Sequence, residues 1–163
     1  MAVVAAIGVI VAGEAMQPPS PGPRVLTDAQ FVKAANTDCA RTMPNLRPSD
    51  GGPFGSAVSP AKAATQIDAA ANGLDQLADR VGALPAADTD RAYITSWLDL
   101  WHRYDAVGHQ YADYLRQHGA TNKAPPMLAT GANVAKSADN FARANGLQSC
   151  EFNFNYNPDP SEF

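Results

Sequence analysis

Two histidines and one aspartate are the side chains whose types and spacing come closest to a reactive site in this sequence. His102, Asp105 and His109 are spaced i, i+3 and i+7, which places them along one edge of a helix. Imidazole and carboxylate groups are ordinary zinc ligands, although a closed site needs a fourth ligand. Along a straight helix the two histidines are about 10 Å apart, at about 1.5 Å per residue, which is too far for both to bind one ion unaided.

The glutamates of the chain supply no further metal ligand beside these three residues. Metal sites in helical bundles draw acids and histidines from facing helices, and the three glutamates all lie outside the predicted helices: Glu14, Glu151 and Glu162. We therefore favour no bound metal and no cofactor, and His102, Asp105 and His109 are only weak candidates for metal ligands. We expect instead that Asp105 pairs with one of the histidines at a half-buried edge.

Aromatic side chains gather in the same segment and suggest a second kind of site. An apolar ligand or haem between helices would be lined by Trp97, Trp101, Tyr104 and His109, with His109 and a tyrosine such as Tyr111 as iron ligands. Alanine-rich neighbouring helices can approach closely and leave little room, whereas bulky rings demand space. Small-molecule binding therefore stays open as the alternative function.

Motifs that carry catalysis are absent from the sequence. It contains no G-x-S-x-G nucleophile turn, no P-loop and no strand followed by G-x-G-x-x-G. Asp99 and Asp105 lie on one predicted helix with no cleft implied, so a glycosidase-like acid pair has no support. The net charge of −4 provides no positive field for a phosphate backbone. We expect neither an enzyme nor a nucleic-acid-binding protein.

The elements that would position these side chains are predicted to be helices. Alanine is abundant after the first dozen residues while Val and Ile are scarce, which favours helix over sheet. Apolar residues recur at helical spacing in four segments. We predict a compact all-α bundle of four main helices, mainly antiparallel because the later links are short: Asp28–Arg41, Ser59–Val81, Asp88–His118 and Pro126–Asn145.

Capping residues mark the ends of these helices. The predicted starts are Thr27 with Gln30 as a capping box, Ser59 before Pro60, and Asp88, and the predicted ends are Gly119 and Gly146, the latter with Leu147 as its apolar contact. Residues 44–59 are glycine- and proline-rich and are predicted to form a surface loop. The domain spans 26–150, and residues 151–163, which alternate aromatic residues and asparagine, are expected to lie on the bundle as an extended strap.

Cys39 lies near the end of the first predicted helix and Cys150 lies just after the last one. Two unrelated buried thiols are one interpretation. An even cysteine count, the placement at both ends of the domain and an apolar run upstream favour a disulfide instead. Neither cysteine belongs to a C-x-x-C pair, so redox catalysis and zinc binding through thiolates have no support.

The beginning of the chain is typical of an export signal. Residues 1–16 contain the uncharged run MAVVAAIGVIVAG, which is too short to span a membrane as a helix. Residues 17–25 contain four prolines and form a spacer. No Lys or Arg precedes Arg24, which departs from a usual signal, and a helix of the domain itself is the other interpretation. We expect this segment to be removed or to tether the protein to a membrane.

Two short stretches resemble a loosely defined group of small exported actinobacterial proteins of unknown function. They are AANTDCAR around Cys39 and FARANGLQSC before Cys150. The resemblance implies an exported helical domain with one end-to-end disulfide and no known activity.

These observations favour a non-catalytic interaction protein that is secreted or belongs to the cell envelope. Its partner would be an envelope protein, bound through exposed aromatic side chains. The expected surface consists of Tyr93, Tyr114, Phe152, Phe154 and Tyr156.

Overall fold

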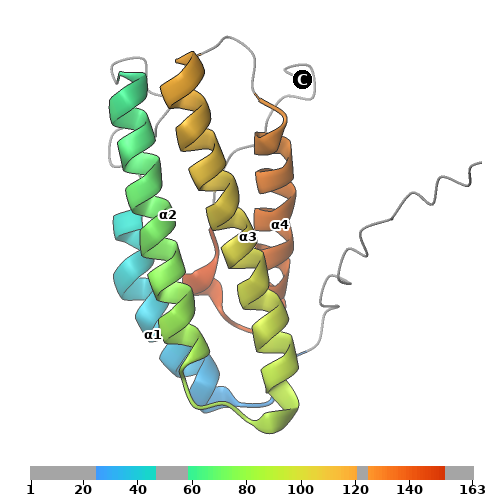
Figure 1. The fold of residues 1–163 in the computed structure, drawn as a ribbon. Coiled ribbons are helices and arrows are strands. Elements are labelled where there is room, and N and C mark those ends of the chain that lie inside the picture. Colours follow the sequence, from blue (N-terminus) through green and yellow to red (C-terminus); the bar gives the residue numbers. More distant parts are fainter. Residues whose placement is uncertain (1–24, 47–58, 121–124, 153–163) are drawn as a thin grey trace, which may run out of the picture.

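The computed structural model describes residues 25–46, 59–120 and 125–152. Within these ranges the chain forms four α-helices and one short 3-10 turn, and no strand (Figure 1). The elements are α1 (Ala29–Leu46), α2 (Pro60–Gly82), α3 (Asp88–His118), α4 (Met127–Ala144) and η1 (Gln148–Cys150). The predicted all-α bundle is therefore confirmed.

The longest helix, α3, lies between two neighbours. It packs against α2 on one side and α4 on the other, while α1 packs against α2 and η1. In Figure 1 the colours show that the chain runs upward along α1 and α3 and downward along α2 and α4. Consecutive helices are therefore antiparallel.

Local chemistry explains most of the helix ends. The Ser59 hydroxyl accepts a hydrogen bond from the Lys62 backbone N–H at the start of α2, and Pro60 occupies the first turn, as predicted. Gly119 ends α3 with a φ of 71°. At the end of α4, Gly146 has a φ of 73° and the Leu147 N–H donates to the Ala142 carbonyl at 2.8 Å. This is the predicted Schellman ending, in which glycine adopts the left-handed conformation without a Cβ penalty.

Two predicted N-caps are wrong. The cap of α1 is Asp28, because its Oδ1 accepts from the N–H groups of Gln30 and Phe31, both at 3.0 Å. The Thr27 hydroxyl donates instead to Asp90 at 2.9 Å. Asp88 is the first residue of α3, so the N-cap position falls on Ala87. The alanine side chain has no hydrogen-bond acceptor and cannot cap the helix.

The prediction that α1 ends at Arg41 is also wrong, because the helix continues through Pro44 to Leu46. Pro44 removes one hydrogen-bond donor from the last turn, but Met43 is buried and Leu46 packs against the core. A Cβ placed on Gly73 of α2 would lie 2.4 Å from Leu46 Cδ2, so Leu46 occupies the space that this glycine leaves. Tertiary packing therefore overrides the local effect of the proline.

Large side chains fill the main core. Trp97 and Trp101 are 0% exposed and lie edge to face, with ring centroids 4.8 Å apart. Trp97 also stacks on Phe141 of α4 and donates its indole N–H to the Ala138 carbonyl at 3.2 Å. A second, smaller cluster of buried residues comprises Ala63, Ala64, Tyr111, Ala112 and Leu115.

Phe152 was expected on the surface but is only 3% exposed. Its ring lies 4.8 Å from that of Tyr104 and 5.8 Å from that of Trp101, centroid to centroid. Its backbone N–H donates to Asp139 Oδ1 at 2.6 Å. The first part of the predicted strap thus belongs to the core, and residues 153–163 lie outside the described ranges.

A disulfide joins Cys39 to Cys150, with the two Cα atoms 5.0 Å apart, and connects α1 to η1. Both cysteines are buried. Around this bond, Asn36 of α1 donates to the Gly146 carbonyl at 2.7 Å and accepts from the Ser149 N–H at 3.0 Å. The two sequence stretches around the cysteines are therefore in direct contact.

Candidate functional site

A row of ionisable side chains follows the boundary between α2 and α3. We call it the polar seam, and it consists of Asp68 and Asp75 of α2 and His102, Asp105, His109 and Arg116 of α3. The two aspartates of α2 are seven residues apart, and so are the two histidines of α3. Because the helices are antiparallel and seven residues make about two turns, each aspartate meets one histidine.

The seam contains short contacts between acids and bases. His102 Nδ1 lies 2.8 Å from Asp75 Oδ1, and His109 Nδ1 lies 2.7 Å from Asp68 Oδ1. His109 Nε2 lies 3.2 Å from Asp105 Oδ1, so Asp105 does pair with a histidine, as expected. Arg116 completes the row by pairing with Asp68.

Asp105 is the most buried acid of the seam, with a side chain that is 13% exposed. Its Oδ1 is buried and accepts no hydrogen bond within the described ranges. The contact with His109 is close enough for an ion pair but is not aligned as a hydrogen bond. A neutral imidazole carries one N–H, and both nitrogens of His109 face carboxylates. A neutral imidazole in this position can therefore donate to only one of the two carboxylates.

The pKa values of two seam carboxyl groups shift in opposite directions. Burial raises the pKa of Asp105, and the charge of Asp75 raises it further, against the opposing effects of His109 and His102. Burial also acts to raise the pKa of Asp68, but hydrogen bonds from Arg116 and His109 outweigh burial and leave the pKa of Asp68 below its usual value. Asp68 therefore holds its negative charge more firmly than Asp105 does.

The structure changes the set of candidate metal ligands. Potential ligand atoms come together in Asp75, His102 and Asp105, all within 4.8 Å of one another. His109, the third residue suggested by the sequence, has its two ring nitrogens directed to Asp68 and Asp105. Asp75 was not predicted, because only the glutamates were counted as acids on facing helices. The matching seven-residue spacings of the aspartates and histidines are the sequence signal that identifies it.

The aromatic residues of the alternative site do not line a common cavity in the described part of the chain. Trp97 and Trp101 are fully buried in the core, and His109 lies on the polar seam. Tyr104 is partly buried against Phe152, and burial together with the charge of Asp139 raises its pKa to about 12. These side chains are therefore divided between the core and the α2–α3 boundary.

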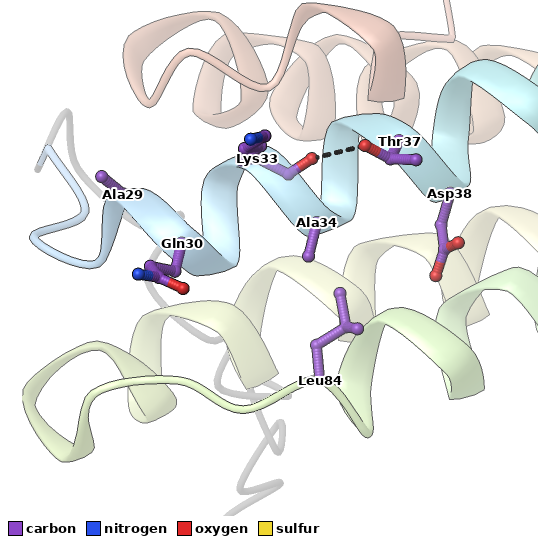
Figure 2. A pocket seen from close by; sticks show the side chains of 7 residues that line it. All are labelled: Ala29, Gln30, Lys33, Ala34, Thr37, Asp38 and Leu84. Carbon is purple, nitrogen blue, oxygen red and sulfur yellow. Dashed lines mark hydrogen bonds between the residues drawn. The ribbon is translucent and has the colours of Figure 1, made fainter.

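Surface hollows lie elsewhere on the bundle. One is formed by the outer face of α1 and by Leu84, which follows α2 (Figure 2). Its lining is mostly small or polar, and Thr37 donates its hydroxyl proton to the Lys33 carbonyl at 2.9 Å. A smaller hollow adjoins the α2–α3 link near Arg91 and Thr95.

Three of the five aromatic residues of the expected partner surface lie in the described ranges. Tyr93 and Tyr114 are partly buried, and Tyr114 stacks on His118 with the ring centroids 4.6 Å apart. Phe152 belongs to the core. Phe154 and Tyr156 lie outside the described residues.

Comparisons with protein-family models, with curated proteins and with solved structures find no match for this chain. The likeness to small exported actinobacterial proteins therefore stays an expectation. None of the helices in the described ranges combines the length and the apolar character needed to cross a membrane.

Proposed function

We propose that this chain is a non-catalytic interaction domain that acts in the cell envelope or outside the cell. The observation that carries the proposal is the buried Cys39–Cys150 disulfide, which joins the first helix to the turn after the last one. Disulfides persist in oxidising compartments and are rare in the cytosol. The apolar run in residues 1–16 supports the same location.

Two observations support a non-catalytic role: the motifs that the sequence lacks and the packing of the tryptophans in the core. No nucleophile motif or phosphate-binding loop occurs in the sequence. The largest aromatic side chains pack against one another in the interior, which favours a structural role for them over a role in ligand binding. The alternative of an apolar-ligand or haem site has correspondingly less support.

Partner binding is assigned to the aromatic side chains of the expected surface other than Phe152, which lies in the core. These are Tyr93, Tyr114, Phe154 and Tyr156. Aromatic residues are enriched in the centres of protein interfaces because they bury a large area at a small entropic cost.

The test is site-directed crosslinking in intact cells of the source organism. A variant with alanine at all four aromatic positions should lose crosslinks to its envelope partner. The matched control replaces four exposed glutamines with alanine, at Gln66, Gln76, Gln110 and Gln117. If the aromatic variant keeps its helical circular-dichroism spectrum and every crosslink, the proposed surface is wrong.

A further inference from the structure

We propose that Asp75, His102 and Asp105 bind one divalent transition-metal ion, such as Zn²⁺, between α2 and α3. One potential ligand atom of each residue lies within 4.8 Å of the other two. Zinc bonds to nitrogen and oxygen are about 2.0–2.2 Å long, so two ligand atoms on one ion are about 3–4 Å apart. Binding would therefore require the three side chains to rotate toward one another until their ligand atoms reach that spacing. This site is independent of the interaction function proposed above.

Close helix packing supports the site. Gly108 of α3 faces α2, and a Cβ placed there would lie 3.3 Å from the Cβ of Ala71. Small residues at this contact let the two backbones approach, which allows an aspartate from α2 to reach side chains of α3. His102 and Asp105 are three residues apart on α3 and therefore share an edge of the helix.

The charges of the polar seam favour a cation at this position. The seam has three carboxylates, those of Asp68, Asp75 and Asp105, and one guanidinium. The guanidinium belongs to Arg116, which pairs with Asp68 and Asp113. Asp75 and Asp105 therefore have only histidines as basic partners in the seam. The buried Oδ1 of Asp105 has no well-formed hydrogen bond within the described ranges. Buried polar atoms normally have partners, and a bound cation supplies the positive charge that this region of the seam lacks.

The ligand types select the class of ion. One imidazole and two carboxylates suit zinc and other first-row transition metals better than magnesium, which is bound mainly through oxygen ligands and water. The side chains of His102 and Asp75 are 43% and 48% exposed. The outer side of the ion would therefore face solvent and take water as its remaining ligands. Such a site is open and exchanges its ion.

The test is equilibrium dialysis of the full chain against Zn²⁺, with bound metal counted by mass spectrometry. We expect one Zn²⁺ per chain, retained in the presence of excess Mg²⁺. Asp75→Asn, His102→Gln and Asp105→Asn should each weaken binding by about tenfold or more, since even residues that only support metal ligands contribute about 10–100-fold to affinity. A melting temperature that rises with Zn²⁺ in the wild type but not in these variants gives a second readout.

Matched controls separate this site from general attraction of cations to the surface. Asp99→Asn and His118→Gln change exposed residues of the same types on α3 and should bind Zn²⁺ like the wild type. Asp75→Asn and His102→Gln alter half-exposed side chains, so the result does not depend on whether Asp105→Asn folds. No bound Zn²⁺, or binding unchanged by both Asp75→Asn and His102→Gln, would overturn the assignment.

Discussion

Asp90 is a buried charged side chain that connects the start of α3 to the start of α1. It is 1% exposed, and its carboxylate accepts from the N–H groups of Thr27 and Asp28 at 2.8 and 2.9 Å. The hydroxyls of Thr27 and Thr89 donate to its other oxygen. A buried carboxylate with this many donors is stabilised in its charged form.

Asp90→Asn should therefore destabilise the fold by about 2–3 kcal/mol, because an amide group replaces one acceptor oxygen and faces donors. The measurement is urea unfolding followed by circular dichroism. Asp88→Asn is the matched control, since Asp88 lies two residues away with its side chain 99% exposed, and it should change stability by less than about 0.5 kcal/mol. Equal effects of the two substitutions would show that the Asp90 contacts contribute little.

The effect of Asp90 should depend on pH. Burial acts to raise its pKa, but hydrogen bonds from Asp28 and Thr27 outweigh burial, so the pKa of Asp90 is lower in the folded protein than the ordinary value. A lowered folded pKa gives stability that is present above the unfolded pKa of about 3.9 and is lost as pH falls through the folded pKa. The stability gap between wild type and Asp90→Asn should accordingly narrow below about pH 4. A gap that is constant from pH 7 to pH 2.5 would contradict this assignment.

Residue-level prediction succeeded where a local motif determines the structure and failed where distant partners compete. Ser59, Gly119 and Gly146 act at helix ends as their types suggest. Thr27 has the right type for an N-cap, but Asp90, 63 residues away, takes its hydroxyl. A prediction from neighbouring residues cannot include this hydrogen bond, because the two partners are far apart in the sequence.

At the scale of elements, the contact between α2 and α3 depends on small residues. Gly108 lies against Ala71 and Ile67 of α2. Gly108→Val should destabilise the fold by about 1–3 kcal/mol by forcing the helices apart. Ala106→Val, at an exposed position on α3, should cost only about 0.5 kcal/mol from helix propensity, and propensity alone predicts no loss for Gly108→Val because valine forms helix better than glycine. Thermal unfolding measures both variants, and a Gly108→Val protein as stable as the wild type would show that the helices are not tightly packed at Gly108.

Element boundaries show which parts of the fold the sequence determines locally. The apolar spacing of the four helices was sufficient to predict the bundle. The extra residues of α1 beyond Arg41 were not predictable, because the last turn is held by Leu46 packing over Gly73 of another helix. Asp75 is a different case, because the seven-residue spacing of Asp68 and Asp75 matches that of His102 and His109 and could have identified it from the sequence.

For the whole molecule, the disulfide is the covalent bond that joins the two ends of the domain, across a separation of 111 residues. In the chain-entropy description a crosslink over about 100 residues stabilises a fold by up to about 4–5 kcal/mol. A variant with Cys39→Ala and Cys150→Ala should lose stability up to that amount in urea unfolding. Reduced wild type is the control, and it should unfold at a similar urea concentration. Unchanged stability in both would mean that the bond does not constrain the unfolded chain.

The most direct test of the central claim is non-reducing peptide mapping of the protein recovered from its native cells. We propose a domain that is tied end to end by a disulfide and that acts outside the cytosol. The predicted result is a Cys39–Cys150 crosslinked peptide in protein from the envelope or the medium. That protein should either begin near Gln17 or be tethered to a membrane by residues 1–16. Free thiols at both cysteines, on soluble cytosolic protein that retains Met1, would contradict the account.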